Sequence, residues 1–74
     1  MTTLDKSKKG QIIKIVSIPN QTVRAQAIRF GIAEGAKVLC QEVIPAGPVI
    51  LQKNKQEIAV GRSLACQIAI EPVA

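Results

Sequence analysis

Short runs of apolar residues recur along the chain, separated by glycine, proline and asparagine, and most of the apolar residues are β-branched. Eleven isoleucines and seven valines stand against four leucines. Branched side chains pack well on a pleated surface and lose conformational freedom in a helix, so this bias predicts a sheet. Strands are expected at residues 11–18, 36–43, 49–53, 56–60 and 67–71, the first of them covered on both faces.

The clearest pattern is a hairpin whose two strands flank the polar pair Asn54 and Lys55. Pairing the strands across this two-residue loop gathers the apolar side chains on one face. A shift of one residue would turn these side chains to the other face, so the register is well specified. The predicted cross-strand pairs are Leu51 with Ile58 and Val49 with Val60.

One short helix is predicted over residues 22–30, between the first two strands. Asn20 precedes it and can accept a hydrogen bond from a free N–H of the first turn. Gly31 follows it, at a position where a positive φ is easiest for glycine. One face of this helix is apolar and is expected in the core; it carries Val23, Ala27 and Phe30.

These elements predict a mostly β fold: a small SH3-like barrel of about five short antiparallel strands, with one short α-helix after the first strand. With 74 residues the chain has room for one domain, 1–74, and residues 1–9 are expected to be loosely ordered. Exposed strand edges could also pair between copies and form a homo-oligomer.

Composition argues against catalysis. The chain has no His, Trp or Tyr, so it lacks a Ser-His-Asp triad and an imidazole general base. The five acidic residues are scattered along the sequence, and no pair has an obvious reason to converge. Phosphate-binding glycine patterns are absent as well. We therefore expect a protein that is not an enzyme.

The two cysteines, Cys40 and Cys66, are weak candidates for a transition-metal site. Two thiolates could hold a soft metal, but a closed zinc site needs four ligands. A buried cysteine more often acts as a small apolar side chain, so no metal or other cofactor is assigned. The chain has no long apolar run and no signal-peptide pattern. We expect a cytoplasmic protein with reduced thiols and no membrane insertion.

A nucleic-acid-binding module is an alternative. The net charge is +5, and several lysines lie near the start of the chain. Residues 10–16 loosely resemble the opening strand of the KOW motif found in ribosome-associated SH3-like domains. Since Phe30 is the only aromatic residue, no stacking platform for bases can be built. Nucleic-acid binding is therefore not expected.

Three segments, in order and at suitable spacing, resemble the FeoA family. Residues 30–38 resemble its hydrophobe-Gly-hydrophobe-x-x-Gly-x-x-Val signature, and residues 45–50 its Pro-x-Gly-x-Pro strand opener, shortened by one residue. Residues 58–70 resemble its closing block, which contains a Gly-Arg pair. The resemblance extends from about Leu4 to Glu71. Ser7 stands where the family usually has an apolar residue, and Gln26-Ala27 where it often has Arg-Leu.

The resemblance implies a small cytoplasmic accessory or regulatory protein of bacterial ferrous iron uptake, which docks on the membrane transporter FeoB. The same module occurs as the C-terminal domain of metal-dependent repressors of the diphtheria-toxin-repressor type. We expect the docking surface at the helix and its exit, where arginines could pair with acidic groups of the partner. The predicted contact residues are Arg24, Arg29, Ile32 and Glu34.

Overall fold

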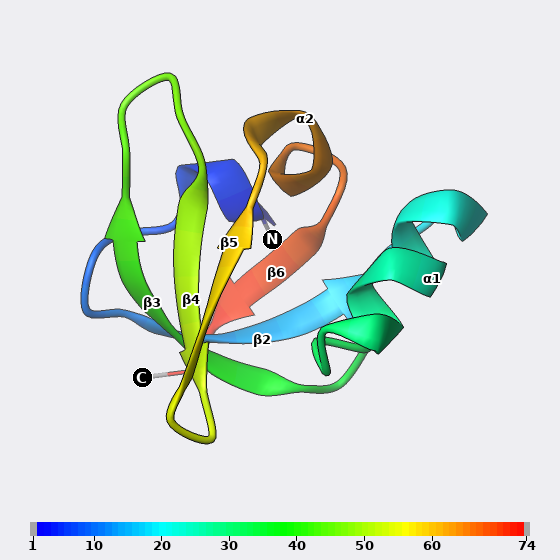
Figure 1. Cartoon of the computed structure of the whole chain (residues 1–74), viewed down its shortest axis with the longest axis horizontal. Coiled ribbons are helices and arrows are strands. Elements are labelled where there is room, and N and C mark those ends of the chain that lie inside the picture. The colour runs from blue at the N-terminus through cyan, green and yellow to red at the C-terminus, as the bar shows by residue number, and fades with distance from the viewer. Residues whose placement is uncertain (1, 74) are drawn as a thin grey trace.

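The computed structural model describes residues 2–73. Its elements are, in chain order, β1 (Thr2–Thr3), a 3₁₀ turn η1 (Leu4–Lys6), β2 (Ile12–Ser17), α1 (Gln21–Arg29), β3 (Lys37–Val43), β4 (Val49–Lys53), β5 (Gln56–Val60), α2 (Arg62–Ala65) and β6 (Ala69–Pro72). All pairings are antiparallel and join the strands into one sheet in the order β1-β6-β2-β3-β4-β5. Figure 1 shows this sheet curling on itself, with α1 standing at one side. The mostly β fold is confirmed, with a further short strand at the N-terminus.

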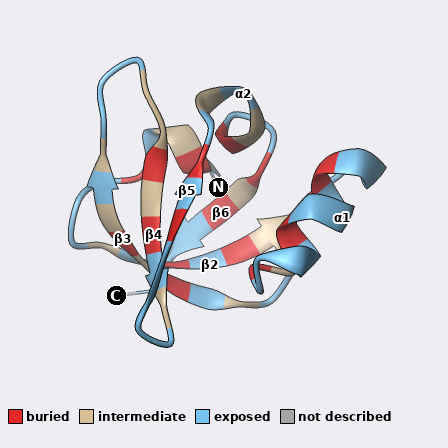
Figure 2. Cartoon of the chain, in the orientation of Figure 1, coloured by how far each residue is buried: buried red, intermediate tan, exposed pale blue. Residues whose placement is uncertain are grey.

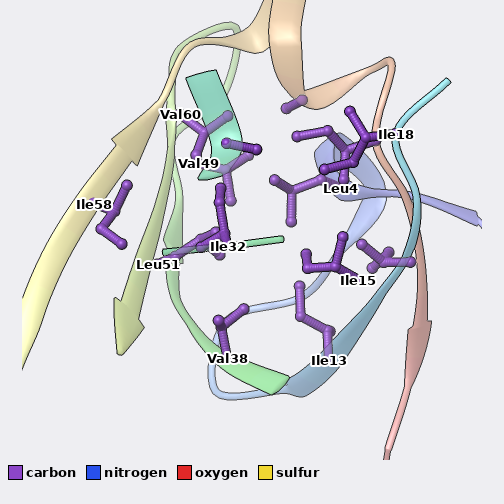
Figure 3. Close-up of a cluster of buried hydrophobic side chains, with 14 of the residues drawn as sticks. Leu4, Ile13, Ile15, Ile18, Ile32, Val38, Val49, Leu51, Ile58 and Val60 are labelled. Carbon is purple, nitrogen blue, oxygen red and sulfur yellow. The ribbon is translucent and has the colours of Figure 1, made fainter. Parts of the chain in front are cut away.

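The core lies inside the curl of the sheet. Along β2 to β5, buried residues alternate with more exposed ones, because successive side chains point to opposite faces (Figure 2). In Figure 3 the buried side chains of β2, β3, β4 and β5 point toward one another, together with Leu4 and Ile32. The outer face of the sheet is less covered. In β2, Ile13 and Ile15 point inward and are fully buried, whereas Ile12 points outward and is 46% exposed. The prediction that this strand is covered on both faces is therefore wrong at its start.

The N-terminal segment is part of the sheet. Thr2 and Thr3 pair with β6, and the N–H of Leu4 donates to the carbonyl of Ile68 at 2.9 Å. The Leu4 side chain is fully buried. The prediction of a loosely ordered segment over residues 1–9 is therefore wrong for its described beginning, since strand pairing and burial of Leu4 hold it in place; Met1 lies outside the described residues.

Ser7 is buried beside this segment although its side chain is polar. Its hydroxyl donates to the carbonyl oxygen of Leu4 at 2.6 Å and lies 3.3 Å from the sulfur of Cys40. A buried hydroxyl is tolerated when it is hydrogen-bonded. This explains how a serine is accommodated at a position where the resemblance suggests an apolar residue.

The predicted hairpin is confirmed with its register. In β4 and β5, Leu51 pairs with Ile58 and Val49 with Val60. The two turn residues, Asn54 and Lys55, have φ values of 52° and 67°, the left-handed conformation that a tight two-residue hairpin turn requires. The loop therefore sets the register, and the register directs four apolar side chains into the core.

Helix α1 is one residue earlier at each end than predicted, and the predicted residues Asn20 and Gly31 flank it. The side chain of Asn20 accepts hydrogen bonds from two backbone N–H groups of the first turn. At the other end Gly31, with φ of 79°, donates to Ile28 O at 3.0 Å, and Ile32 donates to Ala27 O at 2.9 Å. These two bonds form a Schellman motif, in which the residue after the glycine packs back against the helix.

The Schellman motif decides which residue fills the space beneath the end of α1. Phe30 shares a helical face with Val23 and Ala27, yet its side chain is 50% exposed. Ile32 follows the left-handed residue and is 1% exposed. The prediction that Phe30 is a core residue is wrong, because the chain reversal at Gly31 directs Ile32 into the core instead.

Candidate docking site

The predicted docking residues Arg24 and Glu34 bind each other and the end of β2. The Arg24 Nη2 lies 3.6 Å from Glu34 Oε2. Arg24 Nε donates to the carbonyl oxygen of Ile18 at 3.1 Å, and Glu34 Oε2 accepts from the N–H of Ile18 at 2.8 Å. The two charges largely neutralise each other, and their contacts fix the position of α1 relative to the sheet. Both residues therefore help to hold the fold, and both remain exposed.

Of the other two predicted residues, only Arg29 is available to a partner. Ile32 lies in the core and cannot contact a partner in this conformation, so it is removed from the docking surface. Arg29 is exposed at the end of α1 and forms no ion pair within residues 2–73. It therefore presents an uncompensated positive charge beside the exposed ring of Phe30.

Arg29 and Phe30 form one wall of an open groove, and strand β5 forms the other. The groove has a volume of about 550 Å³ and is lined by Arg29, Phe30, Gln56, Glu57, Ile58 and Ala59. In Figure 1, β5 runs along the front of the molecule and α1 stands at the right. We call this feature the α1–β5 groove.

A smaller apolar recess adjoins the groove and shares Phe30 and Ala59 with it. Its volume is about 20 Å³, and its lining is almost entirely apolar. The lining residues that α1 and α2 contribute include Val23, Ala27 and Leu64. The groove therefore combines a charged end, a half-exposed aromatic ring and a small apolar depression.

The hairpin is attached to the helix at this site. The ammonium group of Lys53, the last residue of β4, donates to the carbonyl oxygen of Gly31. A carbonyl near the C-terminus of a helix is a favourable partner for a cation. This contact joins the two walls of the groove at the tip of the hairpin.

Arg62, which was not among the predicted site residues, holds the loop between β3 and β4. Its Nε donates to the carbonyl oxygen of Gly47 at 3.0 Å, and its Nη2 donates to that of Ile44 at 2.8 Å. The planar guanidinium suits two such acceptors. In the sequence, the Gly-Arg pair of the closing block was the feature that could have pointed to Arg62. In the structure, Arg62 stabilises the loop.

The two cysteines occupy different environments. Cys40 is fully buried in β3, next to Ser7, whereas Cys66 is exposed at the end of α2 and donates to the carbonyl oxygen of Ser63 at 3.2 Å. Both thiols are free. Among residues 2–73, no three His, Cys, Asp or Glu side chains gather in a group that could hold a metal ion. Within the same residues, no helix is long and apolar enough to cross a membrane.

Comparison with known proteins decides the family. The family model described as "FeoA domain" matches residues 2–72, nearly the whole chain. The chain belongs to the FeoA family. This membership associates it with ferrous iron transport. No functionally curated protein matches the chain.

Solved structures agree on the fold. A crystal structure described as an iron uptake regulatory protein, FeoA, superposes with a TM-score of 0.87 at 23% identity, and the match covers 97% of each chain. The FeoA protein from Chlorobium tepidum has a TM-score of 0.83 at 24% identity over 99% of this chain and 71% of its own. The manganese regulator SloR contains a similar module: the TM-score is 0.84 at 20% identity, over 96% of this chain and 34% of the regulator. The predicted SH3-like fold is confirmed.

Proposed function

We propose that this FeoA-family chain is a non-catalytic accessory protein of ferrous iron uptake, which docks from the cytoplasmic side on a FeoB-type transporter through the α1–β5 groove. Family membership over residues 2–72 supports the process. The groove supports docking, because it is the place where a half-exposed aromatic ring, an unpaired arginine and an apolar depression meet. The exposed ring of Phe30 is the single observation that carries the placement.

Phe30 exposes apolar surface to water that an interface would bury. Burying an aromatic side chain in an interface contributes strongly to affinity, and aromatic and arginine residues dominate binding energy at protein interfaces. Arg29 lies next to the ring and adds attraction to an acidic partner, with its main effect on the rate of association. Together they give the groove both an anchor and a preference for negative charge.

The test is capture of the detergent-solubilised cognate transporter by the immobilised protein. Phe30→Ala is expected to weaken binding by about 30-fold, which corresponds to about 2 kcal/mol. Ile28→Ala is the matched control, since Ile28 is similarly exposed at the same end of α1 but does not line the groove. Equal capture by the wild-type protein and the Phe30 variant would reject this placement.

The role of charge is tested separately by Arg29→Glu. We expect slower association and weaker capture, with a difference from wild type that shrinks as salt is raised. Lys14→Glu makes the same change of charge at an exposed position of β2 that does not line the groove, and it should have little effect on capture. If the two variants weaken capture of the transporter to the same extent, net charge rather than the groove determines the interaction.

A further inference from the structure

Strand β5 is an open edge of the sheet. It pairs with β4 on one side and with no other strand among residues 2–73. Across a two-residue hairpin loop, Lys53 and Gln56 form the first hydrogen-bonded pair. Along the two strands, hydrogen-bonded pairs then alternate with pairs that share no backbone hydrogen bond. By this register Glu57 and Ala59 direct their N–H and C=O groups away from β4, toward the free edge. No other backbone group within residues 2–73 bonds to them.

This free edge lies along the α1–β5 groove. Glu57 and Ala59 are both among the residues that line it, opposite Arg29 and Phe30. The groove therefore presents a short row of backbone donors and acceptors beside an apolar wall. An extended chain is the ligand that matches such a row, because its own N–H and C=O groups repeat at the same spacing.

The side chains of an added strand would alternate between two environments. Those on the same side as Val60 would face the apolar recess below Phe30. The small size and apolar lining of that recess favour a small apolar side chain over a large or charged one. The others would lie on the outer face, beside the exposed side chains of Glu57 and Ala59.

Charge at the site favours an acidic segment. Arg29 stands at the groove unpaired, and Lys55 lies in the turn that leads directly into β5. The one carboxylate in the groove, that of Glu57, already accepts a hydrogen bond from Gln41 Nε2 at 2.9 Å. Two copies of a chain with net charge +5 repel each other, which argues against a second copy as the occupant.

We propose that the free edge of β5 binds an extended segment of a partner protein as an added strand, with small apolar residues at alternate positions and an acidic residue near Arg29. This deepens the docking role proposed above and rests on it for the identity of the partner. The backbone of β5 supplies affinity, and the recess and Arg29 supply selectivity.

The direct test uses the synthetic peptide DVTVTV, blocked at both ends, added to the ¹⁵N-labelled full chain at concentrations up to about 1 mM. We expect the amide signals of Glu57 and Ala59 to shift and their hydrogen exchange to slow. The same peptide methylated on alternate backbone nitrogens should lose these effects, because it cannot donate the hydrogen bonds. Absence of shifts at both amides, or equal binding by the methylated peptide, would overturn the proposal.

A matched pair of variants tests the edge within the protein. Ala59→Pro removes the outward N–H without removing a bond to β4, whereas Ala59→Val keeps it. We expect the proline variant to bind the peptide about tenfold more weakly or not at all, and the valine variant to bind it. The methylated peptide, used on the wild-type protein, decides the question even if the proline variant does not fold.

Transporter capture separates this proposal from the docking role. If wild type and the proline variant capture the transporter equally and the peptide leaves β5 unshifted, strand addition is rejected and docking stands. If the peptide adds to β5 but wild type captures no transporter, docking by this chain is rejected and the strand site stands. A peptide-free dimer of wild type that the proline variant loses would identify a second copy as the occupant and overturn the proposal.

Discussion

Arg24 and Glu34, ten positions apart, together hold the backbone of Ile18: the guanidinium donates to its carbonyl oxygen, and the carboxylate accepts from its N–H. The side chain of Ile18 is fully buried at the point where β2 ends. The two charged residues therefore replace the strand partners that Ile18 no longer has. Without them, buried backbone groups would lose their hydrogen bonds.

Glu34→Ala is expected to lower the free energy of unfolding by about 1–2 kcal/mol, because the Ile18 N–H loses its acceptor. Glu34→Gln keeps an acceptor oxygen and should cost less. The ion pair itself is nearly half exposed, so its own contribution is small, about 0–1 kcal/mol. Urea unfolding at low and high salt checks this: equal losses in the two variants would show that charge, not the hydrogen bond, matters.

Gly31→Ala is expected to destabilise the protein by about 1–2 kcal/mol, because φ of 79° is unfavourable for a residue with a Cβ atom. Space is not the cause, since nothing lies within 4 Å of an added Cβ. Gly31→Asn should lose less, because asparagine adopts the left-handed conformation more readily. The midpoints of thermal unfolding compare the two. An alanine variant as stable as wild type would contradict the role assigned to this turn.

Arg62→Ala should lower the free energy of unfolding by about 1–3 kcal/mol, since two backbone carbonyls lose a charged donor. Arg62→Lys should recover only part of this loss, because an ammonium group cannot reproduce the planar arrangement of two N–H donors. Amide exchange in the loop between β3 and β4 should speed up in both variants. Full recovery by lysine would show that positive charge alone is sufficient.

The thiols are expected to react differently with a water-soluble disulfide reagent. Cys66 is exposed and should be modified at once in the folded protein, whereas Cys40 is fully buried and should react only on unfolding. Counting the thiols that react before and after denaturant is added checks this. Rapid reaction of both would mean that β3 opens easily. Zinc titration of the wild type and of the Cys40→Ser Cys66→Ser double variant tests the predicted thiolate site directly, since equal binding by both rejects it.

The sequence by itself determined what depends on neighbours along the chain. Alternation of apolar residues located the strands, and the turn at Asn54 set the register of β4 and β5. Asn20 and Gly31 marked the two ends of α1. These features depend on contacts within a few residues, so local patterns were sufficient to predict them.

Only the tertiary structure decided what depends on segments far apart in the chain. Leu4 is held in place by its contact with the start of β6. Phe30 is exposed because Ile32 fills the space under α1. The contacts of Arg24 with Ile18 and Glu34 join positions six and ten residues away along the chain. The α1–β5 groove arises where a helix end and a strand edge from distant segments come together. Local patterns cannot show which exposed groups such long-range packing covers and which it leaves free.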